Sequence, residues 1–134
     1  MKSLRKLTAL IEAGAGLGLV AVPAVVVRLL LGGELVGAGI PLGRVAGVAL
    51  LALGIASWLA SFETQSCAAR GMVSAMAFYN LGAVFVLGAV GLQSQPVGLA
   101  LWPAVILHAA MAVWCVARLL RKPVKSSMFS GFSC

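Results

Sequence analysis

The side chains best suited to chemistry in this 134-residue chain are four polar residues, each set in apolar sequence: Glu12, Tyr79, Asn80 and His108. A carboxyl group among apolar residues can exchange a proton for a cationic ligand, and an imidazole can relay protons. The phenol and the amide can line or hold such a path. These four residues are our candidate polar cluster.

Four long apolar stretches carry the cluster, covering about residues 7–31, 44–62, 71–92 and 97–120. Each is close to the ~20 residues that an α-helix needs to cross a bilayer core of ~30 Å. The composition agrees, since 62% of the residues are hydrophobic and the mean hydropathy is +1.10, above the values of soluble domains. We expect an all-α fold, an integral membrane bundle of four transmembrane helices.

Little sequence lies outside these stretches, which leaves no room for a soluble catalytic module. We expect one transmembrane domain over residues 1–121 and a basic cytoplasmic tail over residues 122–134. The basic start and the segment Val22-Pro23-Ala24 resemble a cleavable signal, but Glu12 interrupts the apolar run and the run continues past the cut. The first helix should therefore remain, and Pro23 can kink it, as Pro103 can kink the fourth.

Lysine and arginine positions indicate the orientation, because cytoplasmic loops carry the excess of both. Both termini and the second connection, placed on one side, hold eight of the ten basic residues: Lys2, Arg5, Lys6, Arg70, Arg118, Arg121, Lys122 and Lys125. We expect a multi-pass protein of the bacterial cytoplasmic (inner) membrane with both termini cytoplasmic. The net charge of +7 then faces anionic lipid head groups, and no nucleic acid is needed as a partner.

Small residues predict how the helices pack, since glycine lets helix backbones approach closely in a membrane. Gly14 and Gly18 form a GxxxG pair in the first helix, and Gly43 and Gly47 form one at the start of the second. The pattern does not say whether the partner is another helix of the chain or another subunit.

The depth of the polar residues follows from a rise of 1.5 Å per residue. His108 and Asn80 each lie ten residues from the arginine that flanks their helix on the cytoplasmic side, and Glu12 lies six after Lys6. The first two are therefore ~15 Å deep and the third ~9 Å deep. Tyr79 shares the depth of Asn80 but points about 100° away on an ideal helix. Three helices can thus bring Glu12, Asn80 and His108 together.

Glu12 and His108 each allow two interpretations. A carboxylate in hydrocarbon costs several kcal/mol unless it is paired, neutral or hydrated, so Glu12 either serves a proton-coupled site or reaches toward Lys6 or Arg5 at the interface. His108 either relays protons or is a neutral imidazole bonded to Asn80, to a serine or to a backbone carbonyl. On the outer side, a grouping of Arg28, Glu34 and Arg44 either binds an anion or partner or forms a solvated ion-pair network.

Residue counts exclude several enzyme classes. One histidine and three acidic residues are too few for a zinc centre, a di-iron site or a Ser-His-Asp arrangement within one chain. No cysteine pair has metal-ligand spacing. We expect no catalytic residue, no metal and no cofactor.

Two resemblances follow from these residues. The set Gly43-Arg44-x-x-Gly47, Tyr79-Asn80, Leu101-Trp102-Pro103 and Leu107-His108-Ala109 resembles a family of small bacterial four-helix inner-membrane proteins of unassigned activity, which implies that Asn80 and His108 are features of the family. The single glutamate of the first helix is similar to that of small multidrug resistance transporters, although the third helix lacks a matching aromatic motif and the connections differ.

These observations support two functional hypotheses. The first is a non-enzymatic structural or accessory subunit, packed by its glycine faces against other membrane subunits or as a homo-oligomer in the lipid bilayer. The second is a proton-coupled small-molecule transporter that uses Glu12. A water-filled cavity at the polar cluster would favour transport, and closure of the cluster by neighbouring helices would favour a structural part.

Overall fold

The computed structural model describes residues 2–62, 67–93 and 96–121. These residues form five α-helices and no strand: α1 (Lys2–Ala21), α2 (Pro23–Leu31), α3 (Gly39–Ala60), α4 (Cys67–Gln93) and α5 (Leu101–Leu120). The expected all-α class is confirmed. The expected basic tail, residues 122–134, lies outside the described residues.

Three of the helices, α3, α4 and α5, are each long and apolar enough to cross a membrane. A fourth span exists if α1 and α2 count together as one broken span. The helices begin away from the predicted starts: α1 at Lys2, α3 at Gly39 and α4 at Cys67 begin earlier, and α5 at Leu101 begins four residues later. Pro41 is compatible with the earlier start of α3 because it falls in the first turn, where an N–H has no partner in the helix anyway.

The predicted first helix, residues 7–31, is broken rather than kinked. α1 ends at Ala21 and α2 begins at Pro23, and the two axes differ by 114°. Val22 between them has a non-helical backbone, with φ −136° and ψ 59°. Pro23 lacks an N–H and starts α2 at a position where none is needed, so the chain turns there with little loss of hydrogen bonding. Pro103, by contrast, lies in the first turn of α5 and breaks nothing.

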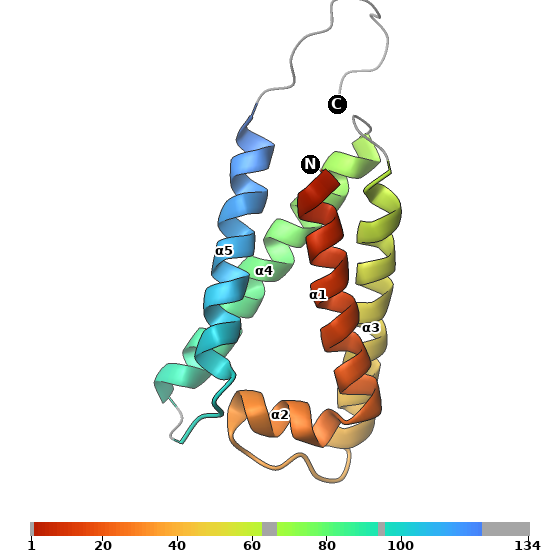
Figure 1. Ribbon diagram of the computed structural model, residues 1–134. Coiled ribbons are helices and arrows are strands. Elements are labelled where there is room, and N and C mark those ends of the chain that lie inside the picture. The colour runs from red at the N-terminus through yellow and green to blue at the C-terminus, as the bar shows by residue number, and fades with distance from the viewer. Residues whose placement is uncertain (1, 63–66, 94–95, 122–134) are drawn as a thin grey trace, which may run out of the picture.

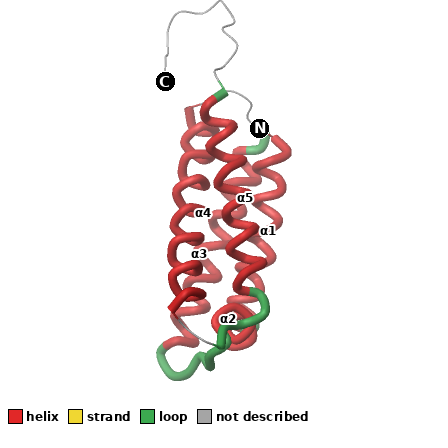
Figure 2. Tube along the Cα trace, turned by 90° about the vertical axis from the view of Figure 1, so that its left-hand side faces the viewer, coloured by secondary structure: helices red, strands yellow, loops and turns green. Residues whose placement is uncertain are grey.

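The long helices form two antiparallel pairs, α1 with α3 and α4 with α5 (Figures 1 and 2). Contacts within each pair run along the helices, whereas contacts between the pairs are sparse. The start of α1 and the end of α5 lie at the same end of the bundle, and α2 lies across the other end (Figure 1). The molecule is therefore two helical hairpins joined at both ends.

Close backbone contact holds the pair α1 and α3 together. A Cβ at Gly47 would lie 2.7 Å from the Gly16 carbonyl oxygen, and one at Gly54 would lie 3.1 Å from the Ala9 carbonyl oxygen. Gly47 has no room for a side chain and Gly54 is tight for one, so glycine permits this approach.

The predicted glycine pairs are correct only in part. Gly47 lies in the α1–α3 contact, but its partner is Gly16 rather than Gly14, which is exposed and has no atom within 4 Å of its Cβ position. A Cβ at Gly18 would lie 3.2 Å from Val26 Cγ2 of α2, and a Cβ at Gly43 would lie 3.1 Å from Pro23 Cβ. These two glycines make room for the turn between α1 and α2, which a straight first helix does not contain.

α2 ties the two hairpins together at its end of the bundle. Gly32 ends α2 in the left-handed conformation, with φ 74°, and its N–H donates to the Arg28 carbonyl, as is common at helix ends. The Ala100 N–H donates to the Leu29 carbonyl at 2.8 Å, and Gly98 packs directly on the same backbone. The segment before α5 is thereby fixed to α2.

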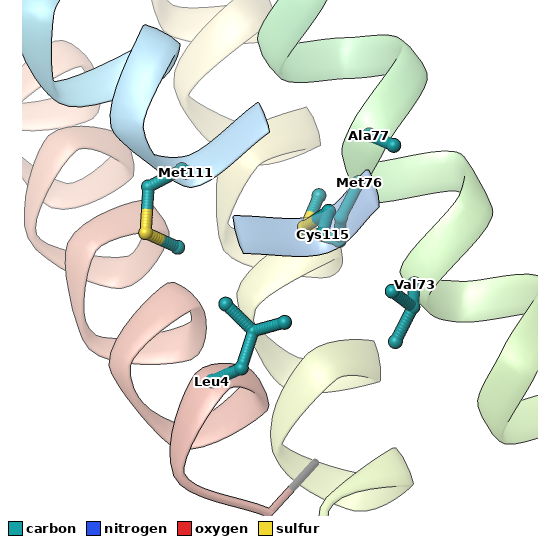
Figure 3. Close-up of a cluster of buried hydrophobic side chains, with 6 residues drawn as sticks. All are labelled: Leu4, Val73, Met76, Ala77, Met111 and Cys115. Atoms are coloured by element: carbon teal, nitrogen blue, oxygen red, sulfur yellow. The ribbon is translucent and has the colours of Figure 1, made fainter. Parts of the chain in front are cut away.

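At the opposite end, a buried apolar cluster joins α1 to the α4–α5 pair. Figure 3 shows its members: Leu4, Val73, Met76, Ala77, Met111 and Cys115. Leu4 comes from the first turns of α1, and the other five come from the facing sides of α4 and α5. This cluster fixes the level at which the two hairpins meet, and the candidate polar residues lie along the same faces.

Candidate functional site

Asn80 and His108 join α4 to α5 through a hydrogen bond. His108 Nδ1 lies 2.8 Å from Asn80 Oδ1, and Asn80 Nδ2 donates to the Met76 carbonyl oxygen at 2.7 Å. Because Oδ1 can only accept, Nδ1 carries the proton and donates. The Asn80 amide is thus held at both ends, and this is the helix–helix contact expected for a neutral His108.

Tyr79 also contacts His108, from the adjacent position on α4. The two rings meet edge to face, with centroids 5.7 Å apart and an interplanar angle of 81°. Although Tyr79 and Asn80 point in different directions, the imidazole is large enough to reach both. Three of the four predicted residues therefore form one connected group.

Glu12 completes the cluster from α1. Its side chain is buried, with 3% of its surface exposed, and its Cβ lies 3.5 Å from the Cβ position of Gly54 on α3. The carboxyl group is near enough to the Tyr79 hydroxyl for electrostatic interaction. Within the described part of the chain, Glu12 makes no hydrogen bond and no ion pair. The structure thus places the four predicted residues in one neighbourhood between the hairpins.

The alternative in which Glu12 reaches toward Lys6 at the interface does not match this arrangement. Lys6 lies over the Trp58 ring, 6.0 Å from its centroid, and forms no ion pair with Glu12 in the described residues. The Lys6 ammonium therefore lies against the Trp58 ring of α3, and the Glu12 carboxyl is buried within the bundle.

Sequence reasoning missed two buried polar residues beside Glu12. Arg5 and Thr8 are 1% and 2% exposed, and Thr8 Oγ1 is buried without a hydrogen bond in the described residues. The spacing 5, 8, 12 puts all three on one face of an α-helix, a signal that was lost because the first helix was taken to begin at residue 7. α1 therefore carries a buried polar stripe.

Comparison with protein-family models, curated proteins and solved structures finds no match for the chain.

One further polar contact links the two hairpins near the cluster. Ser57 Oγ of α3 donates to Met76 Sδ of α4 at 3.5 Å. In the described ranges, no group of three or more His, Cys, Asp or Glu side chains is placed to hold a metal ion. Of the groups gathered here, the Glu12 carboxyl and the His108 imidazole are the ones suited to holding a proton.

Proposed function

We propose that the protein is a proton-coupled membrane transporter of a small cationic molecule, and that Glu12 carries the exchanged proton. The observation that supports this most directly is the buried Glu12 carboxyl, which has neither a hydrogen bond nor an ion pair in the described residues. An unpaired carboxylate in hydrocarbon costs several kcal/mol, so Glu12 holds a proton until a cation arrives. The cation then takes the place of the proton.

The division into two hairpins gives the site a way to open. Glu12 and Tyr79 come from different hairpins, which make few contacts with each other except at their ends. Movement of one rigid hairpin against the other exposes the carboxyl group to one side of the membrane at a time, the kind of rigid-body movement that many membrane transporters use. Tyr79 and His108 then line the path of the proton.

Proton release on binding tests this proposal. The purified protein in mild detergent is titrated calorimetrically with guanidinium, tetraethylammonium and ethidium in two buffers of different ionisation enthalpy. We expect at least one cation to bind with release of a proton, Glu12→Gln to lose that release, and Glu12→Asp to keep it. Gly14→Ala, on the exposed side of the same helix, is the control and should match the wild type. Failure of all three cations to bind, or equal release from Glu12→Gln, would contradict the proposal.

A second candidate is a non-enzymatic accessory subunit of a membrane assembly. Three observations favour it: neighbouring helices close off Glu12 and Asn80, which are 3% and 2% exposed; the Asn80 amide is held by His108 and the Met76 carbonyl; and the three spans bury only 11%, 22% and 17% of their most apolar windows within the chain. The remaining surface is available to lipid or to other subunits. Light scattering of the protein purified in mild detergent separates these cases, since a monomer without a co-purifying chain would contradict the accessory role.

A further inference from the structure

A pocket of about 220 Å³ lies at the end of the bundle that α2 crosses. It is lined by two opposite charges and three apolar side chains: Ala24, Val25, Arg28, Glu34 and Leu35. It is smaller than the ~300–1,000 Å³ of drug-sized ligand sites, so its volume suits a small polar group. The pocket shares no residue with the cluster around Glu12.

The two charges in the pocket are not bonded to each other. Arg28 and Glu34 are both exposed, and no ion pair joins them in the part of the chain that the structure describes. The sequence is compatible with a solvated ion-pair network here, but Arg28 and Glu34 form no ion pair in the described residues. Two opposite charges that face one pocket without pairing can each bind the complementary charge of a ligand.

The chemistry of each charged side chain limits the class of ligand that the pocket can bind. A guanidinium binds phosphate oxygens in a forked, two-bond geometry, which assigns an anionic phosphate to Arg28. A carboxylate accepts hydrogen bonds from a primary ammonium, which has three donors. The lining contains no aromatic ring, so a quaternary ammonium would find none of the ring faces that usually hold it.

The position of the pocket favours a lipid as the source of this group. It lies where α1 has ended and α3 begins, at the end of the spans, and α2 runs across the bundle there (Figure 1). With the apolar helices spanning the bilayer, this end lies at the level of the head groups, and Ala24, Val25 and Leu35 offer an apolar wall to the start of the acyl chains of a lipid. We propose that this pocket binds the head group of a zwitterionic phospholipid with a primary ammonium, its phosphate on Arg28 and its ammonium on Glu34.

Lipid competition in detergent tests the site. The full-length protein is titrated with phosphatidylethanolamine, phosphatidylcholine, phosphatidylglycerol and water-soluble glycerophosphoethanolamine, and bound species are counted by native mass spectrometry. Because exposed ion pairs are weak, we expect a preference of about two- to fivefold for phosphatidylethanolamine over the other two lipids. Glu34→Gln should remove the preference, and Arg28→Gln should weaken the binding of all three.

Arg44→Gln is the matched control, because Arg44 is an exposed cation at the same end that does not line the pocket. It should leave the preference unchanged. Equal binding of phosphatidylethanolamine and phosphatidylcholine, or a preference that survives in Glu34→Gln, would overturn the assignment. Binding of the soluble head group as tightly as the lipid would show that the ligand is a free solute and would overturn the lipid as its source.

Discussion

Replacing Gly47 with alanine should separate α1 from α3. The new Cβ would lie 2.7 Å from the Gly16 carbonyl oxygen and 2.8 Å from the Val20 nitrogen, and both are backbone atoms that a rotamer change cannot move. The helices must therefore move apart by roughly 0.5–1 Å, which forfeits about a quarter to a half of the attraction at each contact. Overpacking of this kind costs about 1–3 kcal/mol.

The matched variant is Gly14→Ala, one of the α1 glycines, where a Cβ meets no atom within 4 Å. Alanine is favoured over glycine in a helix by up to ~1 kcal/mol, and this gain is common to both variants. The difference between them therefore isolates the contact, and Gly47→Ala should be less stable than Gly14→Ala by about 1–3 kcal/mol.

Unfolding in mixed micelles with increasing dodecyl sulfate, followed by circular dichroism and tryptophan fluorescence, measures this difference. Trp58 lies on α3 and packs edge to face on Phe62, with centroids 6.1 Å apart, so it is the one of the three tryptophans that reports on this hairpin. Equal stability of the two variants would refute the reasoning that Gly47 is at the closest approach of α1 and α3.

Three further predictions follow from the fold. In a double-mutant cycle of Asn80→Ala and His108→Ala, the free energies of unfolding should show coupling of about 0.5–1.7 kcal/mol, the range found between membrane helices, and zero coupling would argue against their hydrogen bond. Gly32→Ala should lower stability by about 1–2 kcal/mol, because φ is +74° there, whereas Gly33→Ala, in open space, should have a smaller effect in the same dodecyl sulfate unfolding assay. A fluorescent protein fused to the C-terminus should fluoresce and a periplasmic phosphatase fused there should be inactive if the termini are cytoplasmic, and the reverse pattern would refute that orientation.

The polar contact between α4 and α5 could be predicted because both helices are continuous. The fixed rise per residue puts Asn80 and His108 at one depth, and the hydrogen bond forms there. The close approach of two helices at Gly47 could also be predicted, because glycine lets helix backbones approach closely in a membrane. The residue that Gly47 contacts could not be predicted. A GxxxG spacing identifies which positions share one face of a helix. The packing of the whole hairpin decides which face of α1 contacts α3, and that face carries Gly16.

The turn at Pro23 could not be predicted from the sequence. Loss of one backbone hydrogen bond is compatible with a kink or with a break, and the local residues do not choose between them. Contacts with residues far away in the chain favour the break, because the Ala100 N–H donates to the Leu29 carbonyl and Gly98 packs on the same backbone of α2. Arg5 was missed for a related reason, because a charged residue near a predicted helix end is normally assigned to the interface.

Proton movement in proteoliposomes tests the central proposal about Glu12 most directly. Vesicles that enclose a pH-sensitive dye receive an inward gradient of the cation that binds best among guanidinium, tetraethylammonium and ethidium. Wild-type protein should drive proton exit that follows cation entry, and Glu12→Gln should abolish it while leaving the helical circular dichroism unchanged. Proton exit from Glu12→Gln vesicles at the wild-type rate would contradict the assignment of the exchanged proton to Glu12.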